Sequence, residues 1–375
     1  MWLCRRARRL PHCPRMVVGV LGDWLNTIAL IFGGCSPSNA ITLEHLTTAY
    51  PLSGSLITAF QFLLISLHGL PTHITWSRYG PRFKPHRIPL TPYLVQVALF
   101  YLISMLNNAA FSYRIPMSVH IIFRSGGLVV TMLLGWLVNR TRYTYAQVAS
   151  VLAVTLGVAL TTLSASGAPS PSPEPSATAS AHTYLQGIAI LALALLLSGF
   201  LGLAQDRTYA RYGRPTPGAT TPPGAAPAPT WQESMFFLHF LALPLFLSAR
   251  HDIAAQLAAV NAGPRVSFAF PALRLSLPTL ALPRAYAPLL LNTLTQLVCV
   301  AGVHRLTTRV SALSVTLVLV VRKAASLVLS VWMARGAAPR VELRLMWTGA
   351  ALVLAGTVGY SVATGRAKAK RAKTE

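Results

Sequence analysis

Three basic side chains stand inside stretches that are otherwise almost free of charge. Arg124 lies in HIIFRSGG, and Arg322 and Lys323 are neighbours in TLVLVVRKAAS. A charged side chain at the centre of a bilayer costs roughly 2.5–3.5 kcal/mol even on insertion scales, so such residues face the interior of a helix bundle and meet a partner there. That partner is either a carboxylate, which gives a structural ion pair, or an anionic ligand.

The acidic residues decide between these two partners. The chain has 32 lysines and arginines but only 8 aspartates and glutamates; Glu44 is the one expected beside a membrane cavity, and Asp23 lies near the start of an apolar stretch. One or two carboxylates cannot neutralise three cations, so the pattern favours an anionic substrate. A phosphate-bearing molecule fits, because arginine offers phosphate oxygens a planar fork and lysine offers them a point charge.

The same shortage of acids argues against other membrane functions. A proton-coupled cation exporter needs carboxylates in several spans, and a metal-dependent membrane glycosyltransferase needs paired acids to hold its divalent ion. The four cysteines are scattered without CxxC spacing, which predicts neither a disulfide framework nor a zinc site. We therefore expect no catalytic residue, no metal and no cofactor. A multispan enzyme of glycan or lipid metabolism is the alternative from another class.

Further polar side chains in apolar stretches are candidates for contacts with the uncharged parts of such a substrate. His120 precedes Arg124 by one helical turn and shares its face. Amides bind bases and sugar hydroxyls, but they also link helices, at about 0.6 kcal/mol for each hydrogen bond; both interpretations stay open. The amide candidates are Gln61, Asn107, Asn108, Asn292 and Gln296.

The apolar stretches that must position these side chains are long. The chain of 375 residues is 53% hydrophobic and 11% charged, whereas a soluble domain carries about 25% charged residues. Its apolar blocks are roughly 18–22 residues long, enough to cross a hydrocarbon core about 30 Å thick. We predict an all-α polytopic membrane protein with about ten transmembrane helices, at 17–36, 52–71, 90–111, 115–138, 145–165, 184–204, 231–248, 285–304, 310–334 and 344–363.

The basic residues between the predicted spans indicate the orientation of the chain. With the N-terminus in the cytosol, 21 lysines and arginines lie on the cytosolic side, 8 lie on the opposite side and 3 lie inside spans. Because cytosolic segments of membrane proteins are enriched in basic residues, we expect both termini in the cytosol. We therefore attribute the net charge of +24 to basic residues that orient the chain in the membrane, and we do not expect nucleic acid as a partner.

A short internal repeat relates two parts of the membrane region. When residues 118–138 are set over residues 316–334, Arg124 falls on Arg322. If these stretches are the fourth and ninth spans, the chain consists of two five-helix repeats, and the odd number of spans per repeat inverts the second copy. Inverted repeats with a site at their interface near the membrane midplane are a common transporter design. The span after each copy carries small residues, at Gly157 and Gly356.

The predicted spans divide the chain into two halves, with two low-complexity stretches between spans and a basic segment at each end. Two stretches rich in Pro, Ser and Ala lack the apolar residues that a packed core needs. The predicted segments are a basic N-terminus (1–16), a first five-helix half (17–165), a flexible luminal loop (166–183), a second five-helix half (184–363) with a Pro-rich cytosolic linker (205–230) and a luminal loop (249–283), and a basic cytosolic tail (364–375).

Four stretches carry a resemblance to a known family: GCSPSNAITLEHL (34–46), TAFQFLLISLHG (58–69), LNNAAFSYRIPMSVHIIFRSG (106–126) and LNTLTQLVCVAGVHRLTTRVSALSVTLVLVVRK (291–323). Together they resemble the nucleotide-sugar transporters of the drug/metabolite transporter superfamily, closest to the branch that carries UDP-N-acetylglucosamine and UDP-xylose. The similarity covers most of the membrane core in order and at compatible spacing.

The resemblance implies a fold and a set of substrate contacts. It implies ten spans in two inverted five-helix halves around a central cavity. It also implies alternating-access exchange of a cytosolic nucleotide sugar for a luminal nucleoside monophosphate. By this similarity the phosphates meet Arg124, Arg322 and Lys323. Further contacts fall on Asn107, Asn108, Thr295 and Gln296, and Asn39, Glu44, Ser125, His120, Gln61 and Asn292 complete the candidate substrate-binding set.

The chain departs from this branch at two places. The branch has a compact loop where residues 205–230 are Pro-rich, and it has an acidic residue near the position of Arg309. The first difference indicates an insertion, and the second leaves the charge pairing at the cytosolic end of the bundle open.

The sequence thus predicts a multi-pass antiporter of the endoplasmic reticulum or Golgi membrane that exchanges a UDP-sugar, foremost UDP-N-acetylglucosamine, for UMP. Another nucleotide sugar such as UDP-xylose, or another organic phosphate, is the alternative substrate. The tail KRAKTE nearly fits a retrieval signal that coat proteins recognise, and a plain basic flank is the other interpretation. Membrane lipid surrounds the spans, and formation of a homodimer stays open.

Overall fold

A computed structural model of the chain describes residues 13–34, 39, 42, 43, 45, 46, 49, 50, 53–78, 80–111, 126–165, 177–213, 229–268, 280–333 and 342–374. Within these ranges it describes the backbone but not the side chains at 13–22, 77, 108, 110–111, 162, 165, 177–184, 267–268, 280–281, 323–324, 326–333 and 368–374. All statements below concern this part of the chain.

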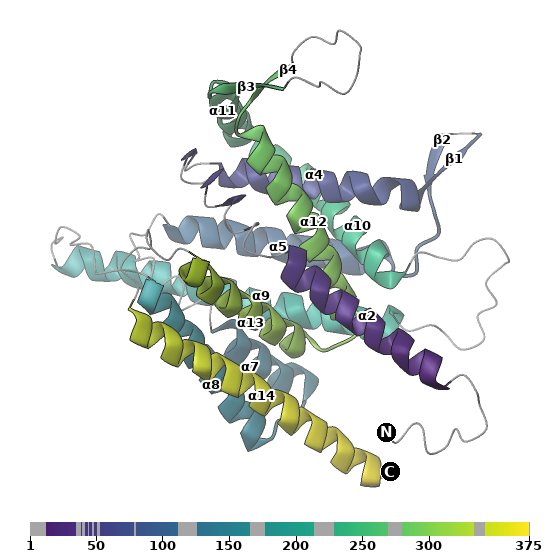
Figure 1. The fold of residues 1–375 in the computed structure, drawn as a ribbon, viewed down its shortest axis with the longest axis vertical. Helices are drawn as coiled ribbons and strands as arrows, with labels where there is room; N and C mark the ends of the chain where they lie inside the picture. Colours follow the sequence, from purple (N-terminus) through teal and green to yellow (C-terminus); the bar gives the residue numbers. More distant parts are fainter. Residues whose placement is uncertain are drawn as a thin grey trace.

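A helix lies at each of the ten predicted membrane spans (Figure 1). Five of the described helices are long and apolar enough to cross a membrane, and a bent pair of helices makes a sixth candidate. The prediction of an all-α, polytopic membrane fold is therefore confirmed. The ten helices are α2 (Cys13–Gly34), α4 (Gly54–His73), α5 (Leu90–Phe111), α7 (Gly127–Asn139), α8 (Tyr145–Ala165), α9 (Ala177–Tyr212), α10 (Thr230–Ala242), α12 (Tyr286–Thr307), α13 (Ala312–Met333) and α14 (Leu343–Thr374).

Two helices are longer than the spans predicted for them. α9 begins inside the segment expected to be a flexible loop and continues through residues 205–212, which were expected to belong to the linker. It fills the proline-free stretch between Pro175 and Pro215, because proline interrupts helices and nothing between these two positions does. α14 likewise continues through most of the basic tail.

The segment 249–283, for which the sequence predicts only a loop, contains a helix and a hairpin. α11 (Arg250–Asn261) is followed by an antiparallel pair of strands, β3 (Arg265–Phe268) and β4 (Leu280–Pro283). A second hairpin, β1 (Ile74–Ser77) and β2 (Gly80–Phe83), follows α4. Its turn contains Gly80 with a φ of +107°, a left-handed conformation that glycine adopts without steric cost.

The seventh predicted span is broken where the sequence places Pro244. α10 ends at Ala242, a 3-10 turn η1 (Leu243–Leu247) follows, and the chain then bends by 90° into α11. Proline has no N–H to donate to the preceding turn, so the α-helix cannot continue through it. After the break, α11 packs against α4 through residues such as Val260.

The contacts between helices follow the pattern of two related halves. α5 packs against α9 and α12 packs against α2, so the third helix of each half meets the first helix of the other. α4 packs against α10, α7 against α13 and α8 against α14, which pairs the second, fourth and fifth helices with their counterparts. These are the pairings that a two-fold relation between five-helix halves produces, and five crossings per half make the second copy inverted.

The start of α2 and the end of α14 lie at the same end of the bundle, whereas β3 and β4 lie at the opposite end (Figure 1). This arrangement is the one that an even number of crossings requires.

The pair α8 and α14 is held together by glycines. A Cβ atom at Gly157 would lie 2.6 Å from the carbonyl oxygen of Gly349, a Cβ at Gly349 would lie 2.6 Å from that of Gly157, and a Cβ at Gly356 would lie 2.7 Å from that of Ser150. Small residues allow helix backbones to approach closely inside membranes, where van der Waals packing drives association. The small residues noted at Gly157 and Gly356 therefore belong to this contact.

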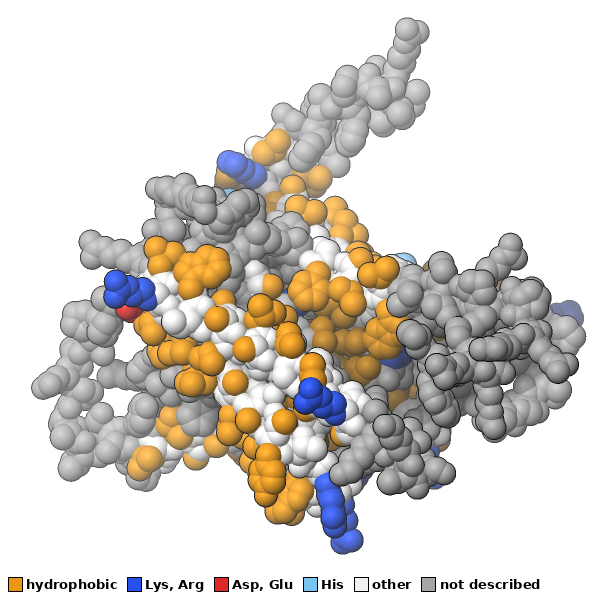
Figure 2. Space-filling model, turned by 60° about the horizontal axis from the view of Figure 1, so that its bottom comes forward, with side chains coloured by type: hydrophobic (Ala, Val, Ile, Leu, Met, Phe, Trp, Pro, Cys, Tyr) orange, Lys and Arg blue, Asp and Glu red, His pale blue; other side chains and the backbone are white. Residues whose placement is uncertain are grey.

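The outer surface of the bundle is apolar. Figure 2 shows apolar side chains spread over the described surface with few basic side chains between them. Leu137 of α7 is 69% exposed and Leu354 of α14 is 65% exposed. Large apolar side chains on the outside of a helical bundle are the surface that lipid requires.

Candidate functional site

A cavity of about 320 Å³ lies between the two halves of the bundle. Its walls come from six helices, with Phe62 of α4 and Phe100 of α5 from the first half. The second half contributes α9, α10, α12 and α13. Most of the wall is apolar, and the polar groups on it are few, which is the usual composition of a small-molecule site.

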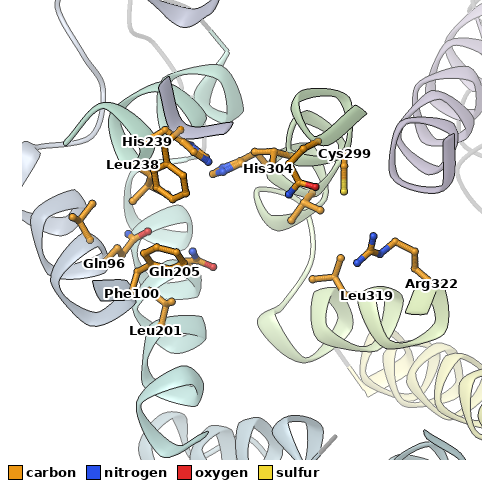
Figure 3. A pocket seen from close by; sticks show the side chains of 15 residues that line it. Gln96, Phe100, Leu201, Gln205, Leu238, His239, Cys299, His304, Leu319 and Arg322 are labelled. Carbon is orange, nitrogen blue, oxygen red and sulfur yellow. The ribbon is translucent and has the colours of Figure 1, made fainter. Parts of the chain in front are cut away.

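Arg322 of α13 lines this cavity, and Figure 3 shows its guanidinium group directed into the open space. Its Nε atom is buried and has no hydrogen-bond partner among the described residues. None of the carboxylates that the structure describes forms an ion pair with it, since the ion pair found in this part of the chain joins other residues. A half-buried guanidinium without a counter-charge among the described residues is costly, so this geometry favours an anionic ligand in the cavity.

Two acidic side chains inside the bundle hold the starts of helices instead. Glu233 of α10, which is 2% exposed, accepts hydrogen bonds from the backbone N–H groups of Arg87 (3.0 Å) and Ile88 (2.9 Å), just before α5. Both carboxylate oxygens of Asp206 lie 2.8 Å from the backbone nitrogen of Ala312, the first residue of α13. Helix starts have unpaired N–H groups and a positive dipole end, so a carboxylate from a neighbouring helix stabilises them.

A third acid supplies a pairing that the sequence left open. Asp23 of α2 and Arg309, which follows α12, form an ion pair of 2.5 Å, and Arg309 also donates to the Thr27 hydroxyl at 3.4 Å. The guanidinium lies 5.6 Å from the centre of the Trp24 ring. The ion pair thus joins the first half to the second half at the end of the bundle where α2 begins.

Three of the amide candidates, Gln61, Asn292 and Gln296, belong to one network beside the cavity. Gln61 donates to the Asn292 side-chain oxygen at 2.9 Å, and Asn292, which is fully buried, donates to the backbone oxygen of Asn39 at 3.1 Å. The Asn39 amide donates in turn to the Thr295 hydroxyl (3.1 Å) and to the Gln296 side-chain oxygen (3.2 Å). These bonds tie α4, α12 and the segment around Asn39 together. Of this group, Gln296 lines the cavity.

Several predicted site residues lie outside the described part of the structure. Asn107 is described, and its amide donates to the backbone oxygen of Ile103 at 2.9 Å within α5. For Asn108 and Lys323 the backbone is described but the side chain is not. Their predicted roles stay predictions, together with those of the undescribed residues Arg124, His120, Ser125 and Glu44.

The cavity also holds polar side chains that the sequence did not single out. They are Gln96 of α5, Gln205 of α9, His239 of α10 and His304 of α12. For Gln96, His239 and His304 a polar residue in a predicted apolar span was a usable signal, whereas Gln205 fell in the predicted linker. Nothing in the sequence, however, indicates that these four positions, far apart along the chain, share one cavity.

Cys299, which also lines the cavity, is disulfide-bonded in the structure. The scattered spacing of the cysteines did not indicate this bond. Among the described residues, no group of three or more His, Cys, Asp or Glu side chains is arranged to hold a metal ion.

The arrangement can bind an elongated molecule with one anionic part. Arg322 supplies the positive charge, the aromatic and apolar walls exclude water, and amides and imidazoles supply hydrogen bonds. A cavity bounded by both halves can open alternately to either side when the halves move against each other, as in transporters built from repeats.

Comparison with known proteins gives this cavity its context. Residues 24–364 match the UAA transporter family. The chain belongs to this family. It is therefore a transporter of the nucleotide-sugar class rather than an enzyme, as the sequence predicted.

Relatives of this transporter extend over most of its length. It is 35% identical over 318 residues to a UDP-N-acetylglucosamine transporter of Saccharomyces cerevisiae, covering 82% of this chain and 86% of the relative. It is 32% identical to a UDP-xylose and UDP-N-acetylglucosamine transporter of Danio rerio, covering 90% and 93%. A UDP-N-acetylglucosamine transporter of Dictyostelium discoideum is also 32% identical, covering 89% and 90%.

A solved crystal structure has the same fold. It aligns with a TM-score of 0.51 at 13% sequence identity and covers 91% of this chain and 98% of the other. At this identity the likeness concerns the fold alone.

Proposed function

We propose that this transporter moves a UDP-sugar, foremost UDP-N-acetylglucosamine, from the cytosol into the lumen of the endoplasmic reticulum or Golgi in exchange for UMP. Relatives at 32–35% identity carry the name of this substrate. The observation that carries the proposal is Arg322, a guanidinium that faces the cavity without a carboxylate partner among the described residues.

The phosphates are the part of the substrate that Arg322 would hold. A guanidinium forms two parallel N–H bonds to a phosphate, and bonds of this charged kind are short and strong. In the proposed site, Arg124 and Lys323 join Arg322, so that the three cations face the two negative charges of a pyrophosphate. The amide network around Asn292 and Gln296 would support the wall beside the substrate.

Exchange, rather than one-way transport, follows from a site with fixed positive charge. When the cavity is empty, closing it on both sides leaves the cations without hydration and without a counter-charge, which is costly. A bound nucleotide sugar or a bound UMP supplies the negative charge in either direction. The return of the transporter is therefore favoured only with an anion in place.

The proposed orientation has both termini in the cytosol and the ion pair of Asp23 and Arg309 at the cytosolic end. Proposed boundaries of the two halves are those predicted from the sequence, 17–165 and 184–363. We also propose that coat proteins recognise the basic tail and return the transporter to the endoplasmic reticulum. Association into a homodimer is a further proposal.

The test is exchange in proteoliposomes that contain the purified transporter. Vesicles preloaded with UMP are offered a panel of labelled nucleotide sugars, and we expect uptake of UDP-N-acetylglucosamine that is stimulated by internal UMP. Vesicles without protein and vesicles loaded with buffer alone are the controls. If internal UMP stimulates the uptake of no UDP-sugar, the proposal is wrong. Faster uptake of UDP-xylose would change the proposed sugar but not the proposed class.

A further inference from the structure

The cavity wall opposite Arg322 carries polar side chains, two of which have a buried atom without a hydrogen-bond partner among the described residues: Oε1 of Gln96 and Nδ1 of His304. Figure 3 shows Arg322 on one side of the cavity and Gln96 and Gln205 on the other, with the rings of His239 and His304 turned toward each other between them. These residues come from five helices that are distant in sequence. None of them belongs to the amide network around Asn292.

Gln96 presents an unused hydrogen-bond acceptor. Its side chain is 1% exposed, and its amide nitrogen donates to the Thr208 hydroxyl at 3.2 Å. The Thr208 hydroxyl already donates its own hydrogen to the Ala204 carbonyl at 2.7 Å, so it can only accept from Gln96, which fixes the orientation of the amide. The remaining atom, Oε1, is buried without a hydrogen-bond partner in the described structure, and Figure 3 shows it directed toward the cavity.

His239 presents a second acceptor by a similar argument. Its Nδ1 atom lies 2.6 Å from the Met235 carbonyl oxygen. A carbonyl can only accept, so Nδ1 carries the hydrogen and Nε2 of the neutral ring is left with its lone pair. The ring of His304 faces it at 5.9 Å between centroids, and the Nδ1 atom of His304 is buried without a partner among the described residues.

Aromatic faces stand next to these acceptors. The ring of Phe62 lies 4.7 Å from that of His239 and 5.6 Å from that of Phe100, measured between centroids. Flat ligands pack on such faces, and polar groups at the edge of the ligand can then reach the acceptors.

We propose that Gln96 and His239 form a subsite that accepts hydrogen bonds from the uncharged, donor-bearing end of the substrate, with Phe62 and Phe100 as its apolar wall. The inference rests on the proposed function. Phosphate oxygens are acceptors and find no donor in the Gln96 oxygen, so the substrate has one direction in the cavity. Its phosphates face Arg322, and its N–H or O–H groups face Gln96 and His239.

Two ends of a nucleotide sugar have this chemistry. The uridine end has the imide N–H of uracil on a flat ring and the hydroxyl groups of ribose, and the N-acetylglucosamine end has its own hydroxyl groups. The two ends differ in which ligands contain them, because UMP and UDP-N-acetylglucosamine both contain uridine but only the latter contains N-acetylglucosamine.

The test compares two cavity variants with two matched controls. Gln96→Leu removes the free acceptor, and His239→Phe removes the ring nitrogens while it keeps a ring against Phe62. The control Gln147→Leu removes a buried glutamine outside the cavity whose amide oxygen and nitrogen are both hydrogen-bonded. The control His73→Phe removes a buried histidine outside the cavity with the same Nδ1 contact to a carbonyl, that of Gly69.

Exchange in proteoliposomes gives the apparent KM for each ligand. For each cavity variant we expect a rise of about tenfold, which corresponds to about 1.4 kcal/mol, and no rise for the controls. A higher KM for both UMP and UDP-N-acetylglucosamine assigns the subsite to the uridine end, and a higher KM for UDP-N-acetylglucosamine alone assigns it to the N-acetylglucosamine end. If Gln96→Leu does not fold, the KM values of His239→Phe alone decide the test.

The outcomes separate this inference from the proposed function. If the unmodified protein exchanges UMP for a UDP-sugar and both cavity variants keep its KM values, the subsite is refuted while the proposed function stands. If the unmodified protein shows no such exchange, the proposed function fails and the subsite is lost with it.

Discussion

Replacing Arg322 by glutamine tests whether its charge serves the ligand or the fold. Arg322 faces the cavity and has no carboxylate partner among the described residues. Hydrogen bonds to charged groups contribute about 1.5–3 kcal/mol each. The loss of two such bonds to a phosphate, at the lower figure, removes about 3 kcal/mol, which weakens binding roughly 100-fold.

Thermal unfolding of the purified protein in detergent, with and without UMP, measures this loss. A ligand at 100 times its Kd stabilises a protein by about 2.7 kcal/mol. After a 100-fold loss of affinity the same concentration equals the Kd and stabilises by only about 0.4 kcal/mol. We therefore expect Arg322→Gln to lose most of the UMP-dependent rise in Tm.

The Tm of the unliganded protein separates the two roles of Arg322, because the change in Tm on substitution has opposite signs for a ligand-binding residue and for a member of a structural ion pair. Removal of a half-buried charge without a counter-charge leaves the Tm of the empty protein unchanged or raises it. Removal of one member of a structural ion pair would lower it. Arg207→Gln is the matched control, because Arg207 is an exposed residue of α9, a cavity-lining helix. A marked drop in the Tm of empty Arg322→Gln, with the UMP effect retained, would refute the reasoning.

Two further predictions concern contacts between the halves. We expect Asp23→Asn and Arg309→Gln each to slow exchange, and the charge swap Asp23→Arg with Arg309→Asp to recover part of the rate; equal rates for the swap and the single variants would exclude a role for the pair. The half-exposed pair (43% and 28%) should affect Tm little. We expect Gly349→Ala to lower Tm by several degrees, because its Cβ would lie 2.6 Å from the Gly157 carbonyl oxygen. Gly365→Ala, in the same helix with open space at its Cβ, should raise or preserve Tm.

The helices at the ten predicted spans could be predicted from the sequence because each span is an apolar block of about membrane length. The ends of the helices were less predictable. Prolines follow the ends of α9 and α10, which agrees with the sequence. The start of α9 was not predicted, because the Ala-rich residues 177–183 extend this helix into a predicted loop. The helix and hairpin in 249–283 have no strong apolar pattern, so no span signal marked them.

Of the residues that line the cavity, the sequence indicated the charged residue Arg322, but it did not indicate most of the neutral wall. Arg322 was identified because an arginine inside an apolar helix is costly in a membrane unless it has a partner. Asn292 and Gln61 were identified by the same rule, yet the structure uses them to link helices. Gln96 and His239 obey the rule too, but only the packing of α5 and α10 around the cavity brings them together.

The glycine contact between α8 and α14 has a consequence for how the protein is made. α8 is the last helix of the first half and its partner α14 is the last helix of the second, so about 180 residues must be synthesised after α8 before the contact can form. Until then the backbone face at Gly157 faces lipid or another helix. The first half therefore enters the membrane with one helix face uncovered. That face is covered only when α14 packs against α8. A truncation before α14 leaves that face open however well the other helices have inserted.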